Sequence, residues 1–362
     1  MAREIAEQPA AIQATLDSLI PLRPDVARLA AGRHQVLFVA RGSSDNAAVY
    51  GRYLLETHSR VSAALAAPSI ATHYRVERDL SNTLVVSLSQ SGETAEIVET
   101  QAWARRCGAA TVAITNHPAS SLAAAADLPM TTLAGQEFAV PATKSYTAQL
   151  AALAVLATAL APEPESLDEA LWTVPGQISR QLEVRDRIDD VSVALAAADS
   201  ILVTGRGLVL GTAQETALKI EETCLRPVRG LSYADLKHGP IAVVGSGLAA
   251  VLVAASDGPI VEAMIELAAD LTVRGATVIG FGGNDAFRSA CQLAVPGPEL
   301  AEMLAPLALI VSPQITVEAL ARSLGLDPDA PRGLSKVTQT DLTQPHPTPP
   351  NSATPNRRQG NE

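Results

Sequence analysis

The chain has 362 residues, a formal net charge of −11 and an isoelectric point near 5.1. Hydrophobic residues make up 47% of it and aromatic residues only 3%, so its core must be built from Ala, Val, Leu and Ile. The acidic balance argues against a nucleic-acid surface, which requires clustered Lys and Arg. No apolar run reaches the ~18–20 residues of a membrane-spanning helix, and the separated cysteines form neither a disulfide framework nor a CxxC metal pair. We therefore expect a soluble, cytoplasmic protein that uses no metal, cofactor, membrane or nucleic acid.

Apolar runs typical of buried strands alternate with helical patterns, and the alternation occurs twice along the chain. In the first part the predicted strands are 36–40, 84–88 and 110–114, with a helix predicted from residue 93 to 106. Similar strands recur about 165–167 residues later, at 201–205, 251–255 and 277–280, with a helical pattern at 260–274. Such alternation predicts parallel sheets covered on both faces. The predicted fold class is α/β, with two tandem, doubly wound, flavodoxin-like domains over 1–170 and 171–336, joined near 163–180.

Residues 337–362 have a different composition from the rest of the chain. They carry five prolines among Thr, Gln and Asn and almost no apolar residue. Such a segment cannot bury enough apolar surface to offset the entropy of ordering it. We predict a disordered tail.

A hydroxyl-rich turn, Ser89-Gln90-Ser91-Gly92-Glu93-Thr94, directly follows the predicted strand at 84–88. A turn from a strand into a helix aims free backbone N–H groups and the positive end of the helix dipole at one point. The Ser89, Ser91 and Thr94 hydroxyls add donors, and Gly92 allows close approach of a ligand. This combination favours a phosphate monoester; the alternative is an ordinary helix cap, which needs only one of the hydroxyls. The corresponding turn of the second half reads Ser256-Asp257-Gly258-Pro259, where a carboxylate would repel phosphate.

Glu215, Lys219 and Glu222 are spaced for one face of a predicted helix. A carboxylate and an amine held side by side can shift each other's protonation and act as a proton-transfer pair. The alternative is a solvated Glu–Lys pair that only supports the helix.

His238 lies in Leu236-Lys237-His238-Gly239-Pro240, where glycine and proline indicate a loop. Histidine side chains in general titrate close to neutral pH, which suits proton exchange with a sugar oxygen, while the alternative is a histidine of a surface turn. The remaining histidines show no metal-ligand spacing with one another or with cysteine. Walker-A and GxGxxG patterns are absent, and Gly205-Arg206-Gly207 is an incomplete match.

Together these motifs resemble the SIS (sugar isomerase) family, and specifically the isomerase half of glucosamine-6-phosphate synthase. The resemblance extends over nearly the whole chain before the tail and rests most strongly on residues 88–94 and 236–240. It implies that Ser89, Gln90, Ser91 and Thr94 hold the sugar phosphate and that Ser44, Gly42 and Thr143 lie at the sugar. It also implies that Glu222 is the base between C1 and C2 and that His238 opens the ring. Lys219 would lie beside the base, Lys336 would reach the open-chain carbonyl, and a homodimer would share its sites across the interface.

The chain departs from the family pattern at two positions. The usual Val-Ala-Ser-Thr-Lys reads Val140-Pro141-Ala142-Thr143-Lys144, so one serine hydroxyl is lost. Arg41 replaces a neutral residue and brings a positive charge near the proposed phosphate or a substrate carboxylate.

The family-like region starts within a few residues of Met1 and the first cysteine is Cys107, so we expect no glutamine-hydrolysing module. The expected function is an isomerising amino-sugar-phosphate deaminase. Alternatives are a fructosamine-6-phosphate deglycase, a synthase-like isomerase subunit supplied with ammonia, and a non-enzymatic sugar-phosphate sensor.

Overall fold

A computed structural model describes residues 1–162, 167–185 and 187–336. The predicted disordered tail therefore lies outside the described residues. Within them, no helix is both long and apolar enough to cross a bilayer.

The first sheet has five parallel strands in the order β2-β1-β3-β4-β5. Their bounds are β1 Gln35–Val39, β2 Ser62–Leu65, β3 Thr83–Leu88, β4 Ala110–Thr115 and β5 Leu128–Thr131. Every residue of β3 and β4 is buried, as expected for central strands covered on both faces. The predicted strands at 36–40, 84–88 and 110–114 are thus confirmed.

The second sheet has the corresponding strand order, β7-β6-β8-β9-β10, again with every pairing parallel. Its strands are β6 Ser200–Gly205, β7 Val228–Ser232, β8 Leu248–Ala254, β9 Thr277–Gly282 and β10 Leu293–Val295. In each sheet the first strand of the chain lies next to an edge, the second strand forms that edge, and the later strands are added on the other side of the first. The order reverses between β1 and β3 and between β6 and β8, and such points are where α/β sheets bind ligands.

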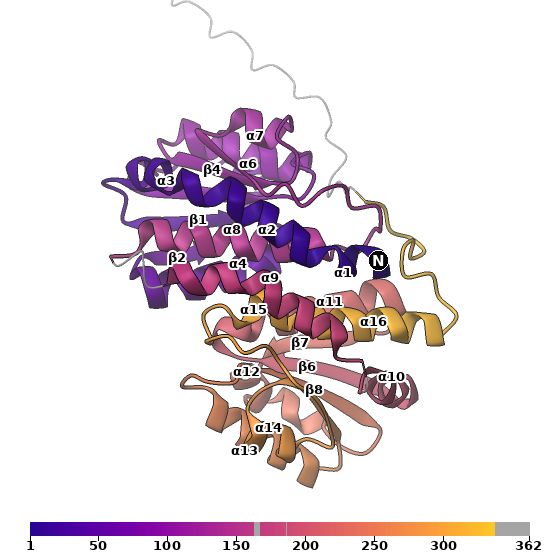
Figure 1. Ribbon diagram of the computed structural model, residues 1–362. Coiled ribbons are helices and arrows are strands. Elements are labelled where there is room, and N and C mark those ends of the chain that lie inside the picture. The colour runs from indigo at the N-terminus through magenta and orange to yellow at the C-terminus, as the bar shows by residue number, and fades with distance from the viewer. Residues whose placement is uncertain (163–166, 186, 337–362) are drawn as a thin grey trace, which may run out of the picture.

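The helices cover both sheets and fill the space between them (Figure 1). Those of the first half are α1 Ala2–Ala6, α2 Gln8–Leu19, α3 Arg23–Ala30, α4 Ser43–Leu54, α5 Ser69–Thr72, α6 Ala95–Arg106, α7 Ser121–Ala125 and α8 Lys144–Leu160. Those of the second half are α9 Asp168–Glu183, α10 Ile188–Ala197, α11 Leu210–Cys224, α12 Tyr233–Lys237, α13 Val261–Val273, α14 Asp285–Ala290, α15 Ala305–Leu309 and α16 Val311–Ser323. Figure 1 shows α4, α8, α9, α11, α15 and α16 in the band between the two sheets.

The main hydrophobic core is continuous across both halves, with α8 near its centre. Fifteen residues of α8, Lys144 to Thr158, are buried, which the Ala-rich sequence of this helix permits because small side chains let neighbouring helices approach closely. Helix α11 packs tightly against α4 at Gly211, where a Cβ would lie 2.4 Å from the Asn46 carbonyl oxygen. Helix α4 follows β1 and helix α11 follows β6, so the two helices occupy equivalent places in the two halves. Their contact requires a glycine at position 211.

Three details differ from the sequence predictions. Helix α6 begins at Ala95 rather than residue 93, because Gly92 has φ +66° and Thr94 is extended. Most of the predicted junction at 163–180 is helix α9, which buries Leu171, Val174 and Ile178. The edge strands β2, β5, β7 and β10 were not predicted, because their runs are short and partly exposed.

Candidate active site

The hydroxyl-rich turn lies at the carboxyl end of β3, beside the point where the first sheet reverses its strand order. Gly92 is required there twice over: its φ is +66°, and a Cβ would lie 2.2 Å from Ser120 Oγ. The Leu122 amide donates to the Gly92 carbonyl at 3.0 Å, and the Asn116 amide donates to the Gln90 carbonyl at 3.1 Å. The turn is therefore fixed by the neighbouring loop after β4.

The hydroxyls of the turn do not cap helix α6. Thr94 occupies the N-cap position without a side-chain capping hydrogen bond. Ser89 Oγ accepts from the Gly92 amide at 3.1 Å, and Ser91 Oγ accepts from the Glu93 amide at 3.2 Å, so both hold the turn while their protons stay free to donate elsewhere. Thr94 Oγ1 lies 3.5 Å from Ser89 Oγ. The geometry is consistent with an oxygen-rich anion at the helix N-terminus and gives no support to the simple capping alternative.

Arg41 is paired with a carboxylate beside the turn. Its Nε and Nη2 donate to the two carboxylate oxygens of Glu96, each at 2.9 Å. Glu96 lies in the first turn of α6, and its side chain is only 7% exposed. The charge that Arg41 adds to the family pattern is thus largely neutralised by its own chain.

The equivalent turn of the second half is filled by a carboxylate. A Cβ on Gly258 would lie 2.2 Å from Glu302 Oε2, and the remaining cavity, lined by Arg206, Asp257 and Glu302 among others, measures only about 10 Å³. Burial and the charge of Asp257 raise the pKa of Glu302. The turn of the second half therefore has little room for an anion, and an anion site in the first half alone stays a prediction.

Helix α11 carries a buried acid–amine–acid row that faces α4. Lys219 Nζ lies 3.5 Å from Glu215 Oε1 and forms a close ion pair and hydrogen bond with Glu222. From the first half, Asn46 Nδ2 donates to Glu215 Oε2 at 2.9 Å. Glu215 and Lys219 are almost fully buried, whereas the Glu222 side chain is 25% exposed. The solvated-pair alternative is therefore wrong for this row, since only Glu222 reaches the surface.

Burial and mutual charge shift the protonation of this row. Burial raises the pKa of Glu215 to about 7, although the Lys219 charge and the Asn46 hydrogen bond oppose the rise. Burial on its own would lower the pKa of Lys219, but Glu215 and Glu222 raise it above its ordinary value. Lys219 is thus held as a cation beside Glu222, the only member of the row with access to a ligand.

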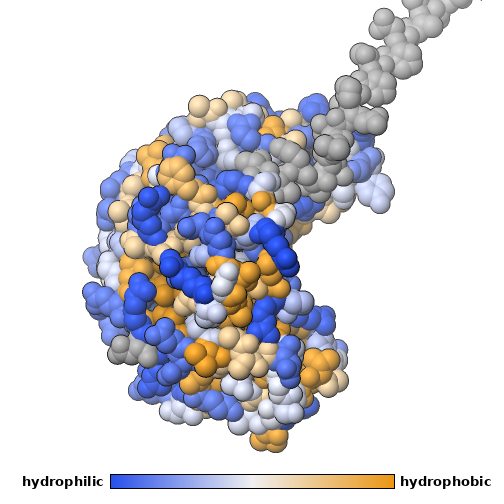
Figure 2. Space-filling view, turned by 90° about the vertical axis from the view of Figure 1, so that its right-hand side faces the viewer, coloured by the Kyte–Doolittle hydropathy of each residue, from blue (hydrophilic) through white to orange (hydrophobic). Residues whose placement is uncertain are grey.

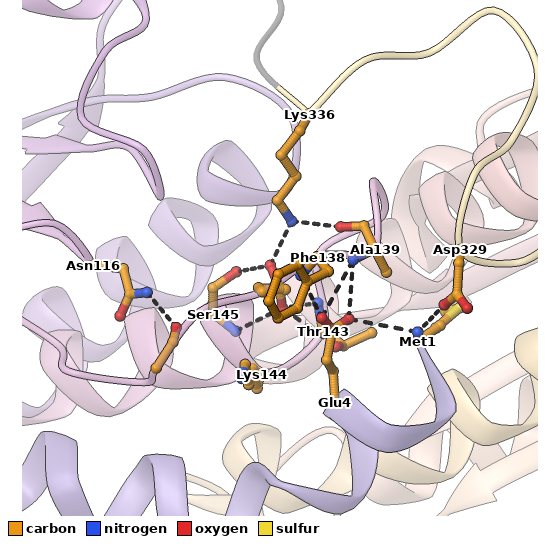
Figure 3. A network of polar contacts seen from close by, with 12 residues as sticks. Met1, Glu4, Asn116, Phe138, Ala139, Thr143, Lys144, Ser145, Asp329 and Lys336 are labelled. Carbon is orange, nitrogen blue, oxygen red and sulfur yellow. Dashed lines mark hydrogen bonds and ion pairs between the residues drawn. The ribbon is translucent and has the colours of Figure 1, made fainter.

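A second buried carboxylate, Glu137, accepts hydrogen bonds from residues around the start of α8. The Thr143 amide donates to Glu137 Oε1 at 2.9 Å, and Ser145 Oγ donates to Oε2 at 2.5 Å. Lys336, from the C-terminal end of the described chain, donates to Glu137 Oε2 at 2.9 Å and to the Ala139 carbonyl at 2.6 Å (Figure 3). Burial acts to raise the pKa of Glu137, but Lys336 and these hydrogen bonds hold it below its ordinary value.

The charge of Glu137 also raises the pKa of Lys219, so the Glu137 cluster and the α11 row are electrostatically coupled. Thr143 is fully buried, and its hydroxyl donates a hydrogen bond to Glu137 at 3.3 Å. The hydroxyl proton of Thr143 is therefore already used inside the protein. Lys144 pairs with Glu7 of the N-terminal segment at 2.6 Å.

Gly42 and Ser44 lie at the start of α4, at the carboxyl end of β1. Gly42 has φ +58° and its carbonyl accepts from the Asp45 amide at 3.0 Å, while Ser44 is 8% exposed. The first turn of α4 also includes Asn46, which donates to Glu215 of the α11 row. This turn therefore lies between the carboxyl end of β1 and the α11 row.

His238 stands apart from these groups. It caps the short helix α12, is exposed, and is followed by Gly239 at φ +130°. The imidazole makes no hydrogen bond to another residue in the described part of the chain. The single chain thus brings together Lys219 with Glu222 and Lys336 with Glu137, but not His238 with either.

The sequence did not single out Glu137, Asn46 or Glu96, which hold the site residues in place. Glu137 is the one charged residue in an otherwise uncharged stretch, 128–143, directly before Lys144. A single acidic residue in such an uncharged stretch could have indicated a buried carboxylate. Asn46 and Glu96 carried none, because their partners lie 169 and 55 residues away.

Comparisons with known proteins agree with this architecture. The SIS domain model matches residues 30–159. A glutamine–fructose-6-phosphate aminotransferase of Thermococcus kodakarensis is 33% identical over 347 residues, covering 93% of this chain and 57% of the relative. The chain therefore spans little more than half the length of that relative.

Two solved structures extend the comparison. A protein of Silicibacter pomeroyi with the provisional name phosphosugar isomerase is 33% identical, with a TM-score of 0.81 over 91% of this chain and 99% of that one. A glucosamine-6-phosphate deaminase of Thermotoga maritima has a TM-score of 0.76 over 93% of this chain and 98% of that one, and at 23% identity it shows the shared fold alone. The fold defines a two-sheet α/β protein of the sugar isomerase type. The chain belongs to the SIS family.

Proposed function

We propose that this protein is an amino-sugar-phosphate deaminase that transfers a proton between C1 and C2 of a hexosamine 6-phosphate and releases ammonia. The observation that carries the proposal is the Glu222–Lys219–Glu215 row, which leaves one carboxylate accessible next to a buried cation. Membership of the SIS family supports a sugar-phosphate substrate. The N-terminus of α6, with its uncapped hydroxyls, supports a phosphate handle.

In the proposed reaction the turn at 89–94 holds the 6-phosphate. Glu222 takes the proton from C2 of the open-chain aldosamine and returns it to C1, which leaves a C2 imine and a C1 hydroxyl. Water then adds to the imine carbon, and ammonia departs to give the ketose phosphate. The Lys219 ammonium stabilises the Glu222 carboxylate before it takes the proton and after it returns it, and Lys336 provides a positive charge for the developing oxygen at C1.

The amine-releasing direction needs only water as a co-reactant, so it requires no ammonia supply. The opposite direction, ketose phosphate plus ammonia, needs an ammonia supply and is the alternative suggested by the aminotransferase relatives. The deglycase alternative gains no support, because the Arg41 guanidinium that would meet an amino-acid carboxylate is already bound by Glu96.

We assign ring opening to His238, which a second copy of the chain would have to bring to the site. A mixture of His238→Asn and Glu222→Gln chains tests this assignment. Each variant alone should be inactive on cyclic substrate, and the mixed dimers should regain up to half of the wild-type activity. Activity that does not return in verified mixed dimers would place both residues in one chain's site, and a His238→Asn chain that is active by itself would remove His238 from the site.

The function itself is tested by measuring ammonia release from glucosamine, galactosamine and fructosamine 6-phosphates, with the non-phosphorylated sugars as matched controls. We expect ammonia and ketose phosphate from a hexosamine 6-phosphate and none from its non-phosphorylated form. Synthesis from fructose 6-phosphate plus ammonium, without release, would favour the aminotransferase-like alternative. Thermal stabilisation by sugar phosphates without any turnover would favour the sensor.

A further inference from the structure

Outside the candidate active site, the protein has a cleft of about 470 Å³ between α6 and the irregular segment 73–82. On one wall are Glu99, Trp103 and Arg106, whose spacing of four and three residues places them on one face of α6. The opposite wall is formed from the segment before β3 and includes Arg75, Glu77 and Arg78. A volume of this size is typical of small-molecule sites.

The walls of the cleft are fixed by contacts between α6 and the irregular segment. Trp103 Nε1 donates to the Val76 carbonyl at 2.9 Å, and the Leu80 amide donates to the Cys107 carbonyl at 2.8 Å. The Leu80 side chain is buried against the core beneath. The segment is therefore tied to α6 at two points, and a ligand would meet a largely preformed surface.

Three arginines, Arg75, Arg78 and Arg106, and two glutamates line the cleft, so its lining carries a small positive excess although the chain as a whole has a net charge of −11. The side chains of Arg78, Arg106, Glu77 and Glu99 all line this cleft, and within the described chain none of them makes a hydrogen bond or an ion pair. Guanidinium groups bind phosphate oxygens in pairs, and carboxylates accept hydrogen bonds from hydroxyl groups. Trp103 is only 6% exposed with its indole N–H already used, so little aromatic face remains to stack a base.

We propose that the cleft is a second binding site, separate from the candidate active site, for a small phosphate ester that carries hydroxyl groups. The phosphate would meet the guanidiniums of Arg78 and Arg106, and the hydroxyls would donate to Glu77 and Glu99. The site differs from the turn at 89–94, because the turn precedes α6 whereas the cleft lies along its later part, from Glu99 to Cys107. A helix of 12 residues is about 18 Å long, so one phosphate cannot serve both places.

Calorimetric titration of the full chain with sorbitol 6-phosphate, which cannot isomerise, tests the proposal. The wild type should bind two molecules per chain, and the Arg78→Gln/Arg106→Gln variant should weaken one site at least tenfold and keep the other. Thr94→Val should do the reverse. Arg274→Gln, which removes an exposed arginine paired with Asp270 on α13, is the matched control and should bind as the wild type does.

The two proposals fail in different ways in this experiment. A single site that Thr94→Val weakens and the arginine pair does not would overturn the second site. A single site that only the arginine pair weakens would support the cleft and count against the phosphate role of the turn. Binding unaffected by the arginine pair would overturn the cleft in either case.

Alkylation of Cys107, which lines the cleft, provides an independent readout. Burial raises the pKa values of Cys224 and Cys291 to about 12, so these two thiols should react slowly. Sorbitol 6-phosphate should slow alkylation of Cys107 several-fold in the wild type but not in Arg78→Gln/Arg106→Gln. An alkylation rate that saturating ligand leaves unchanged in the wild type would contradict the placement of the ligand in the cleft.

Discussion

The Lys336 ammonium lies 2.9 Å from the carboxylate of Glu137, a fully buried residue 199 positions earlier in the chain. The same carboxylate accepts hydrogen bonds from the Thr143 and Ser145 amides. One acidic side chain therefore fixes both the start of α8 and the C-terminal segment that carries Lys336. Figure 3 shows Lys336 extending toward Ala139 and the residues at the start of α8, with Glu4 and Met1 close by.

We predict that Glu137 and Lys336 are strongly coupled in stability. Either Glu137→Gln or Lys336→Met should lower the free energy of unfolding by roughly 2–4 kcal/mol, because each leaves a largely buried charge without its partner. In a double-mutant cycle by urea unfolding, the coupling energy should be at least about 1 kcal/mol. Lys237→Met, at an exposed lysine of α12, should change stability by no more than about 0.5 kcal/mol. Additive effects at Glu137 and Lys336 would show that the pair is not formed in solution.

Substitutions in the turn at 89–94 should act on substrate affinity. Thr94→Val removes a hydroxyl that does not cap α6, so stability should be unchanged while KM for a phosphorylated sugar rises about tenfold or more. Inorganic phosphate should also inhibit the variant less than the wild type. Thr57→Val, at an exposed threonine whose hydroxyl donates to the Tyr53 carbonyl of its own helix turn, is the matched control. An unchanged KM would remove Thr94 from the phosphate site.

Glu215 should make stability depend on pH in an unusual direction. Its pKa is raised from 4.5 to about 7 in the fold, so the folded chain keeps a proton that the unfolded chain releases between these values. Stability should therefore fall as pH rises from about 4.5 to about 7, by roughly 3 kcal/mol at most, and then stay level with respect to this group. Urea unfolding at several pH values should show this decline flattened in Glu215→Gln. Glu221→Gln, at an exposed position of the same helix, should keep the wild-type profile, and an identical profile for both variants would refute the assignment.

Alanine substitutions at Gly92 and Gly42 separate the cost of backbone strain from the cost of a steric clash with a neighbouring side chain. Both have positive φ, but a Cβ at Gly42 meets nothing within 4 Å, whereas at Gly92 it would overlap Ser120. Gly42→Ala should cost about 1–3 kcal/mol from backbone strain alone, because Gly42 has φ +58° and ψ −132°, outside the left-handed helical region. Gly92→Ala should cost clearly more and should also weaken phosphate inhibition, because the turn must move. Thermal unfolding of both variants provides the comparison. Equal losses of stability would mean that the turn moves to accommodate the added methyl group at little cost.

The central strands and the hydroxyl-rich turn after β3 could be predicted because their signals are local. A fully apolar run such as 84–88, followed by small hydroxyl residues and a glycine, determines its own conformation. The spacing of Glu215, Lys219 and Glu222 likewise predicted a shared helix face correctly. The family resemblance added roles for these residues that remain predictions.

The surroundings of the site could not be predicted, because they depend on contacts distant in sequence. Nothing near Arg41 indicates that Glu96 binds it, and nothing near Glu215 indicates that Asn46 reaches it from the other half. The burial of Thr143 follows from the position of Glu137, which in turn depends on Lys336. Such networks arise only when helices from both halves pack together.

Proton exchange in D₂O tests the central claim most directly. The wild type, incubated with glucosamine 6-phosphate and followed by NMR, should incorporate deuterium at C1 of the ketose product as ammonia is released. Glu222→Gln should lose this exchange by at least about 100-fold while keeping its fold and its affinity for inorganic phosphate. Exchange at the wild-type rate in Glu222→Gln would contradict the account of Glu222, and a wild type that neither exchanges nor turns over any hexose phosphate would contradict the proposed function itself.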